Sequence, residues 1–210
     1  MLLIGAKGHA KEIIDVLDQC STLKDVSLFD DISKDLPAKL YGRFKIIRTI
    51  SGVRAEFKKD RRFILALGCP GIRRKMALRF ISLGGILSSV VSPRARIGNF
   101  EVHIGAGVNI MTGVMVSNSV TIGEGTLLNA NSTVHHDTRI GKYCEISPGA
   151  NITGRCRIGD FCSIGTGAVI LPGVELGDNV VVGAGAVVHR NVKASMVVAG
   201  VPAKTIRCGG

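Results

Sequence analysis

The chain of 210 residues contains no tryptophan, and aromatic residues make up only 4% of it. No apolar stretch approaches the roughly 20 residues that a membrane-spanning helix needs. The apolar opening Met1–Ile4 is followed at once by Gly5, Lys7 and His9, which predicts a buried first strand and not a signal peptide. We therefore expect no membrane span and a cytoplasmic protein.

Cys-x-x-Cys pairs, which bind metals or carry redox chemistry, are also missing. Cys20, Cys69 and Cys208 are dispersed along the chain, and the other three cysteines occupy one column of the repeat described below. This spacing favours free thiols in a reducing cytoplasm and predicts no metal site.

Acidic residues are fewer than basic ones, and the formal net charge is +11. The basic residues cluster in the N-terminal part, as in Lys58–Arg62 and Arg73–Lys75. No aromatic residues interleave them and no nucleic-acid-binding motif occurs, so we expect no nucleic-acid partner. A small phosphorylated ligand fits this charge better.

From Ile104 onward, every sixth residue is Ile, Leu or Val for fifteen positions. They are Ile104, Ile110, Val116, Ile122, Leu128, Val134, Ile140, Ile146, Ile152, Ile158, Ile164, Ile170, Leu176, Val182 and Val188. Neither a helix nor an ordinary sheet has a period of six. One buried aliphatic residue per short repeat is typical of a β-solenoid, in which each flat face contributes one inward side chain.

The other columns of the repeat agree with this prediction. Two residues before each aliphatic position stands a small or β-branched residue, which also points inward and includes Cys144, Cys156 and Cys162. Glycine recurs every eighteen residues from Gly105 to Gly177, so three faces of six residues make one triangular coil. A narrow aliphatic core leaves no room for rings, which explains the few aromatics. Corner positions that need positive φ are expected at Gly107, Gly113, Gly125, Asn131, Gly149, Gly167, Gly173, Asn179 and Gly185.

Residues 1–86 follow another pattern, in which short apolar runs alternate with amphipathic ones. We expect strands at Met1–Ile4, Val26–Phe29 and Phe63–Leu67, and helices at Ala10–Cys20 and Ile72–Leu83. Alternating strands and helices imply a small parallel sheet. The expected domains are therefore 1–86 (α/β), 87–190 (solenoid) and 191–210 (a C-terminal tail).

Ligands of parallel sheets bind at the carboxyl ends of the strands. In this chain those ends are Gly5–His9, Asp30-Asp31 and Gly68. The glycine loop Gly5–His9 leads into a helix, so it can offer backbone N–H groups to an anion, although a tight turn is the alternative.

Two solenoid corners could carry chemistry. One coil separates His136 from Gly154, which would put a base next to a backbone N–H, a layout suited to acyl transfer. Asp137 could fix the imidazole tautomer; exposed histidines without a role are the alternative. In another column Pro148, Thr166 and Ala184 would leave a smooth groove, suited to an extended thioester arm or to a subunit contact.

Taken together, the chain resembles the left-handed β-helix acyltransferases built on hexapeptide repeats. It resembles more closely the sialic-acid O-acetyltransferase-like family, which includes the UDP-4-amino-sugar N-acetyltransferases of bacillosamine-type pathways. The motifs that carry the resemblance are Gly5–His9, Leu28–Asp31, Leu67-Gly68 with Ile72–Lys75, His136–Gly141, Ile146–Ala150 and Gly200–Lys204.

The resemblance implies a Rossmann-like N-terminal domain, a left-handed parallel β-helix and a homotrimer with active sites between subunits. It implies acetyl-CoA as co-substrate and a nucleotide-linked amino sugar as acceptor, here a UDP-4-amino-4,6-dideoxy sugar. Carried over by position, the catalytic residues are His136 (base), Asp137 and Gly154. The implied acceptor-binding residues are Lys7, Gly8, His9, Asp30, Asp31 and Gly68, and the implied acetyl-CoA-binding residues are Glu145, Thr166 and Ala184. Glu145 departs from the family pattern, which usually has histidine there.

Three other functions are alternatives for a solenoid of this kind. Acetylation of a sugar hydroxyl, as in sialic acid modification, uses the same fold and stays open. A zinc hydratase would need three converging imidazoles, which His103, His135 and His136 do not supply. A non-enzymatic scaffold would leave the His136 corner and the glycine loop unexplained.

Overall fold

The computed structural model describes the backbone of residues 1–208 and the side chains of residues 1–206, so the expected Cys208 thiol lies outside the described side chains. The N-terminal part is an α/β domain with one six-stranded sheet. Its elements are β1 (Leu2–Ile4), α1 (Gly8–Gln19), β2 (Ser27–Phe29), β3 (Lys39–Leu40), β4 (Phe44–Ile47), α2 (Ile50–Phe57), β5 (Arg62–Leu65), α3 (Pro70–Ser82) and β6 (Ile86–Leu87). The strand order is β3-β4-β2-β1-β5-β6, and only the β3–β4 pair is antiparallel.

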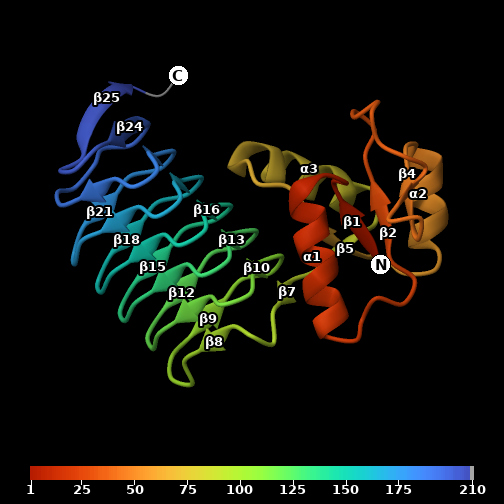
Figure 1. The fold of residues 1–210 in the computed structure, drawn as a ribbon, viewed down its shortest axis with the longest axis horizontal. Helices are drawn as coiled ribbons and strands as arrows, with labels where there is room; N and C mark the ends of the chain where they lie inside the picture. Colours follow the sequence, from red (N-terminus) through yellow and green to blue (C-terminus); the bar gives the residue numbers. More distant parts are fainter. Residues whose placement is uncertain (209–210) are drawn as a thin grey trace.

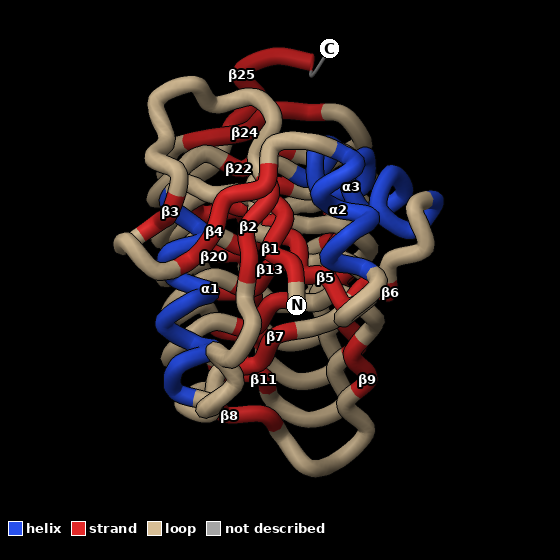
Figure 2. Tube along the Cα trace, turned by 90° about the vertical axis from the view of Figure 1, so that its right-hand side faces the viewer, coloured by secondary structure: helices blue, strands red, loops and turns tan. Residues whose placement is uncertain are grey.

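Helices cover both faces of this sheet, as the alternation of buried side chains along the strands requires. Leu3 of β1 packs on the side of α1, whereas Leu2 and Ile4 pack on the side of α2 and α3. Figure 2 shows α1 on one side of the strands and α2 and α3 on the other. The sequence predicted the three central strands and the two longer helices, but not the β3–β4 hairpin, α2 or β6.

The C-terminal part is a parallel β-helix, or β-solenoid, of three sheets built from two-residue strands (Figure 1). The first sheet, called face 1, contains β7 (Val90–Val91), β10 (Asn109–Ile110), β13 (Leu127–Leu128), β16 (Glu145–Ile146), β19 (Ser163–Ile164) and β22 (Val181–Val182). Face 2 contains β8 (Arg96–Ile97), β11 (Met115–Val116), β14 (Thr133–Val134), β17 (Asn151–Ile152), β20 (Val169–Ile170) and β23 (Val187–Val188). Face 3 contains β9 (His103–Ile104), β12 (Thr121–Ile122), β15 (Arg139–Ile140), β18 (Arg157–Ile158) and β21 (Glu175–Leu176).

The predicted eighteen-residue coil is confirmed by the strand register, in which Asn109 pairs with Leu127 and Leu127 pairs with Glu145. Fourteen of the fifteen aliphatic positions are buried. The prediction was wrong for Ile104, which is 38% exposed. It lies in β9, the terminal strand of face 3, so no coil covers it from below.

All nine predicted corner residues have positive φ. The same six-residue series also places Glu101, Ser119, Asp137, Tyr143, Arg155 and Phe161 in the left-handed region, with φ between 51° and 60°. Sequence reasoning missed these six because only glycine and asparagine adopt that conformation easily. The repeat therefore dictates the backbone at each corner and overrides the preference of the residue there.

The coil geometry continues beyond residue 190 into the segment expected as a tail. Val192 forms a parallel bridge with Leu176 of face 3, and β24 (Met196–Ala199) pairs in parallel with β22 of face 1. The chain then reverses, and β25 (Lys204–Cys208) pairs antiparallel with β24. This hairpin covers the last sheet edge of face 1.

Two buried polar side chains join the α/β domain to the solenoid. The side-chain amide of Asn109, in face 1, donates a hydrogen bond of 2.7 Å to the carbonyl of Leu65. Arg73, in α3, donates through Nε to the carbonyl of Gly125 at the corner between faces 3 and 1, and through Nη1 to the carbonyls of Leu65 and Leu67. The α/β domain therefore rests on face 1 and its adjoining corner.

Candidate active site

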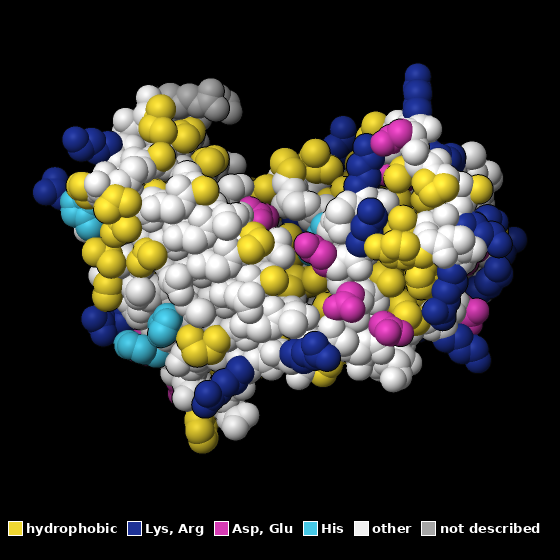
Figure 3. Space-filling view, in the orientation of Figure 1, with side chains coloured by type: hydrophobic (Ala, Val, Ile, Leu, Met, Phe, Trp, Pro, Cys, Tyr) yellow, Lys and Arg dark blue, Asp and Glu magenta, His cyan; other side chains and the backbone are white. Residues whose placement is uncertain are grey.

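A pocket of about 330 Å³ opens at the carboxyl ends of β1, β2 and β5. All six residues expected to bind the acceptor line it, namely Lys7, Gly8, His9, Asp30, Asp31 and Gly68. Figure 3 shows the molecule hollowed between the α/β domain and the solenoid, with acidic side chains at the rim. The topology therefore brings together three loops that lie far apart in the sequence.

The amino end of α1 forms one wall of this pocket. The helix begins at Gly8, and neither a side-chain cap nor an acidic residue in the first turn satisfies its leading N–H groups. A Cβ on Gly8 would have open space around it, so a ligand can approach the backbone closely. Free N–H groups and the positive end of a helix dipole make an anion-binding site.

His9 lies at the floor of the pocket with both ring nitrogens engaged. Nδ1 lies 3.0 Å from a carboxylate oxygen of Glu12, and Nε2 lies 3.2 Å from the side-chain amide nitrogen of Asn109. The tautomer that satisfies both contacts carries its proton on Nδ1. The His9 side chain is 11% exposed, and its contact with Asn109 joins the glycine loop to the solenoid.

The charged residues Lys7, Asp30 and Asp31 of the pocket each have a partner within the chain. Asp30 accepts hydrogen bonds from the backbone N–H groups of Ile32 and Ser33 at 3.1 and 2.8 Å. Asp31 forms an ion pair with Arg79 at 3.0 Å, and the Lys7 ammonium lies 3.4 Å from Asp35. Within the described part of the chain, no hydrogen bond engages the second carboxylate oxygen of Asp30, so it can accept one from a ligand. To bind a ligand, Asp31 must release Arg79 and Lys7 must release Asp35.

His136 and Asp137 occupy the corner between faces 2 and 3. Nδ1 of His136 lies 2.7 Å from Oδ2 of Asp137, so this nitrogen carries the proton and Nε2 is left as the basic atom. The His136 ring stacks against Gly154 of the next coil, where a Cβ would lie 2.7 Å from both Cε1 and Nε2. Only glycine at position 154 leaves room for the ring.

The backbone of Gly154 offers one further polar group at this corner. Its carbonyl accepts a hydrogen bond from Gly173, but within residues 1–208 its N–H has no hydrogen-bond acceptor. A free N–H beside an imidazole can stabilise a negatively charged oxygen. His136 and Asp137 are 52% and 56% exposed in their side chains, so this corner faces outward from the chain.

The residues expected to bind acetyl-CoA lie on other parts of the prism. Thr166 and Ala184 are exposed at the corner between faces 1 and 2, after β19 and β22, and Glu145 is the outward residue of β16 in face 1. His136 follows β14 of face 2. One chain therefore brings Glu145, Thr166 and Ala184 to one side and leaves His136, Asp137 and Gly154 at a separate corner.

Glu145 has the most unusual surroundings of these residues. Its carboxylate oxygens each lie 2.9 Å from the hydroxyl of Ser147. Burial raises the pKa of Glu145, against the opposing effects of the Ser147 hydroxyl and the positive charge of Arg73. Arg73 itself is completely buried, and this burial lowers its pKa to about 10.

Sequence reasoning missed Arg73 and Asn109 as residues that shape the site. Arg73 stands in a run of basic residues that suggested an exposed surface, and Asn109 stands at an outward position of the repeat. Both are buried only because the two parts of the chain pack together. Within the described side chains, no group of three or more His, Cys, Asp or Glu residues has the arrangement of a metal site, and no described helix is long and apolar enough to cross a membrane.

The fold and the pocket define a two-part hexapeptide-repeat protein, and comparisons with known families agree. A model of the bacterial transferase hexapeptide matches residues 119–154 and 155–190, and a model of the PglD N-terminal domain matches residues 1–80. The chain belongs to the bacterial hexapeptide transferases that carry a PglD-type N-terminal domain. No curated protein sequence gives a significant match.

Solved structures resemble the whole chain. Perosamine N-acetyltransferase from Caulobacter crescentus, a mutant in complex with CoA and GDP-perosamine, is 29% identical with a TM-score of 0.90, over 98% of this chain and 96% of that one. The acetyltransferase domain of PglB from Neisseria gonorrhoeae, in complex with acetyl coenzyme A, is 30% identical with a TM-score of 0.89. WeeI from Acinetobacter baumannii is 28% identical with a TM-score of 0.89, and both of these alignments cover 98% of each chain.

Proposed function

We propose that this protein is an acetyl-CoA-dependent N-acetyltransferase that acts on the amino group of a nucleotide-linked amino sugar. The observation that carries the proposal is the likeness of the whole chain to acetyltransferases solved with CoA, acetyl-CoA and GDP-perosamine. The alignments include the N-terminal domain, which holds the proposed acceptor pocket. Similarity in the solenoid alone would have supported the fold but not the kind of acceptor.

The acceptor binds in the pocket at the carboxyl ends of β1, β2 and β5. Its diphosphate lies at the amino end of α1, where the Gly8 backbone and the Lys7 ammonium supply positive charge. Asp30 and Asp31 accept hydrogen bonds from the base or ribose, and Gly68 leaves room for them. The proposed acceptor is a UDP-4-amino-4,6-dideoxy sugar, on the resemblance of the N-terminal motifs.

The chemistry is a direct transfer with His136 as general base. The amine nitrogen of the sugar attacks the thioester carbonyl carbon, and Nε2 of His136 takes a proton from that nitrogen. The N–H of Gly154 stabilises the oxyanion, a contribution of about 3 kcal/mol in a site closed to water. The intermediate then expels the CoA thiolate, which takes the proton back from the imidazolium.

The active site lies between two subunits of a homotrimer. Support comes from the separation within one chain, where the acceptor pocket and face 1 lie apart from the His136 corner. An adjacent copy can bring its His136 corner to face 1, and acetyl-CoA would then run along Thr166 and Ala184 with its acetyl group near Glu145. The half-exposed His136 would become enclosed in the same step.

The activity is tested by thiol release from acetyl-CoA with UDP-, dTDP- and GDP-linked amino sugars, each paired with its hydroxyl counterpart. Turnover with an amino sugar supports the proposal and identifies the nucleotide. Turnover with hydroxyl sugars alone would assign the protein to sugar O-acetylation. No thiol release with any member of the panel would refute an acetyltransferase of nucleotide sugars.

The shared site is tested by mixing two inactive variants, His136→Ala and Gly8→Val. Each mixed trimer then contains one interface where a wild-type pocket meets a wild-type base. Random mixing of equal amounts restores about one quarter of the wild-type activity. An interface is active only when one subunit supplies an intact pocket and its neighbour supplies an intact His136, and each condition is met about half the time. If the site lay within one chain, mixing would restore none.

A further inference from the structure

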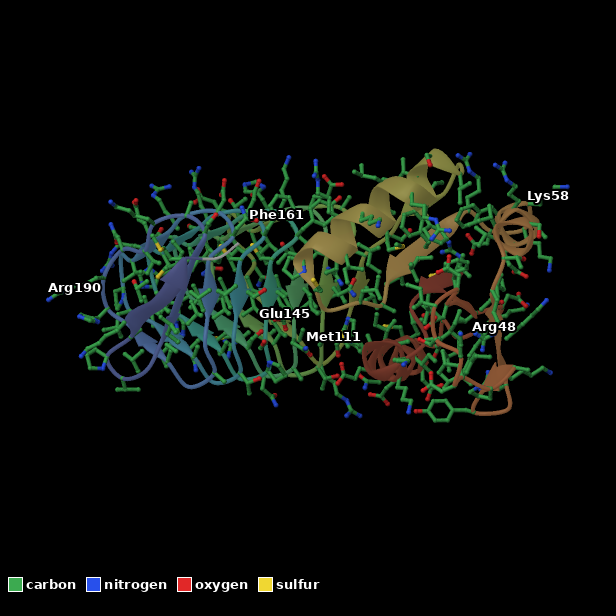
Figure 4. All side chains as sticks on the ribbon, turned by 90° about the horizontal axis from the view of Figure 1, so that it is seen from above. Arg48, Lys58, Met111, Glu145, Phe161 and Arg190 are labelled. Carbon is green, nitrogen blue, oxygen red and sulfur yellow. The ribbon has the colours of Figure 1, made fainter. Side chains whose placement is uncertain are left out.

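Glu145 belongs to a column of outward residues on face 1. The strand register stacks Asn109, Leu127 and Glu145 in three successive coils. Asn109 and Leu127 are 0% and 1% exposed because the α/β domain covers them, whereas Glu145 is only partly buried. The cover provided by the α/β domain therefore ends at Glu145. Figure 4 shows Glu145 and Met111 in the half of the solenoid nearest the α/β domain.

This position lies close to the acceptor pocket. His9, which lines the pocket, touches Asn109 at 3.2 Å, and Glu145 stands two coils further along the same column. Two coils correspond to about 10 Å. A second link runs through Arg73, which donates a hydrogen bond to Leu67 in the pocket wall and attracts the Glu145 carboxylate. A ligand whose phosphates rest on α1 can thus reach Glu145 with its far end.

The charge of Glu145 has no direct counterpart among the side chains of residues 1–206. Among the described side chains it forms no ion pair, and the Arg73 guanidinium acts on it only from a distance. The Ser147 hydroxyl and the Asn129 side chain hydrogen-bond to the carboxylate, but both groups are neutral. A partly buried carboxylate without a cationic partner is costly, and a cation that binds there removes the cost.

We propose that Glu145 binds the ammonium group of the acceptor sugar and makes the enzyme select amino sugars over hydroxyl sugars. This inference rests on the proposed function and gives position 145 an acceptor role at the place where acetyl group and amine meet. A carboxylate accepts hydrogen bonds and repels a thioester oxygen, so its chemistry suits the amine and not the donor. An ammonium group forms a charge-assisted hydrogen bond with the carboxylate, in which both partners are ionised, whereas a neutral hydroxyl forms a weaker one.

The same contact helps the transfer itself. The bound ammonium first releases one proton to solvent, because a nitrogen without a lone pair cannot attack. The neutral amine then attacks the thioester carbon, and its nitrogen carries a positive charge until it gives a second proton to His136. The carboxylate of Glu145 stabilises this developing charge, while Ser147 holds the carboxylate in place. Glu145 therefore binds and orients the nitrogen, and the proton itself passes to His136.

The test compares wild type with Glu145→Gln by calorimetry and steady-state kinetics. The ligands are a UDP-4-amino-4,6-dideoxyhexose and the UDP-6-deoxyhexose with a hydroxyl at the same carbon. Wild type should bind the amino sugar more tightly, and Glu145→Gln should lose roughly 10- to 100-fold in affinity for it while binding the hydroxyl sugar as before. The affinity for acetyl-CoA should stay within about twofold.

Two further variants complete the design. Glu175→Gln is the matched control, because Glu175 also precedes an inward aliphatic residue but lies exposed on face 3. It should leave the preference unchanged. Glu145→Asp keeps the charge and should retain part of the preference.

The outcomes separate this inference from the proposed function. An unchanged amine preference in Glu145→Gln, or a loss of acetyl-CoA affinity alone, would overturn the role of Glu145 and leave the acetyltransferase proposal intact. If wild type bound neither UDP sugar nor the corresponding dTDP or GDP sugars, both proposals would fail together.

Discussion

The substitution Gly154→Ala tests whether the space beside His136 is part of the catalytic machinery. The new Cβ would lie 2.7 Å from Cε1 and Nε2 of the imidazole, whereas carbon atoms in contact prefer a separation of roughly 3.5 Å or more. The ring must therefore move away by about 0.8 Å or rotate about its side-chain bonds. Position 154 does not have positive φ, so alanine causes no backbone strain there.

The expected result is a large loss of turnover with little loss of stability. A displacement near 1 Å costs about 100-fold when it affects a group that must meet the reacting atom. The ring is half exposed and can move outward, so the free energy of unfolding should change by less than about 0.5 kcal/mol. The Gly154 N–H remains in Gly154→Ala, so the loss reports on the ring and not on the oxyanion donor.

Thiol-release kinetics and urea unfolding measure the two quantities. The control is a double-mutant cycle, in which Gly154→Ala is added to His136→Ala. Once the ring is gone the added methyl group has nothing to displace, and kcat should fall by less than about twofold further. A wild-type kcat for the single variant Gly154→Ala would show that the position of the His136 ring has no catalytic role.

Three further predictions concern stability. Ile152→Ala should lower the free energy of unfolding by about 2–5 kcal/mol because Ile152 is fully buried. Ile104→Ala, at a position 38% exposed, should lower it by less than about 1 kcal/mol. Equal losses of stability in urea unfolding would contradict the assignment of the core. Arg73→Met should cost about 2–4 kcal/mol, because the carbonyls of Gly125 and Leu67 lose their side-chain donor, whereas Leu65 keeps that of Asn109; a gain in stability would show that the buried charge outweighs these hydrogen bonds. Burial raises the pKa of Glu145 above its ordinary 4.5, so the folded state binds the carboxyl proton more tightly than the unfolded state does. The protonated carboxyl therefore adds to the free energy of unfolding. This stabilisation is complete below pH 4.5 and is lost as the pH rises through the raised pKa. Glu145→Gln should therefore unfold at a higher urea midpoint than wild type at neutral pH and lose this advantage below pH 4.5; a difference independent of pH would refute the reasoning.

Much of the solenoid could be predicted because its pattern is strictly periodic. One aliphatic residue in six fixes which side chain points inward, and the eighteen-residue glycine series fixes the length of the coil. The pattern failed at Ile104 because a period says nothing about where the stack of coils begins. It also missed the positive φ of Asp137 and Tyr143, where the geometry of the coil determines the backbone.

In the α/β domain the sequence predicted the three strands that are buried on both faces and the helices that cover them. The β3–β4 hairpin was missed because charged residues such as Lys39 and Lys45 interrupt its short apolar pattern. The grouping of Gly5–His9, Asp30-Asp31 and Gly68 was predictable, because parallel strands end at one edge of their sheet. The pairing of His9 with Asn109 was not, since those residues are a hundred positions apart.

The sequence by itself determined the α/β and solenoid parts of the fold and the length of the coil. It also led to the proposal of which residues act as base, anion-binding loop and acetyl-CoA groove. The fold class and the coil length depend on the spacing of residues along the chain, which can be read directly from the sequence. Only the tertiary structure decided that Arg73 is buried between the α/β domain and the solenoid. It also decided that Glu145 stands partly buried at the edge of the surface that the α/β domain covers, and that the His136 corner lies on another side of the prism. Burial and charge pairing depend on which surfaces meet, and that depends on how two separately folded parts of the chain pack against each other.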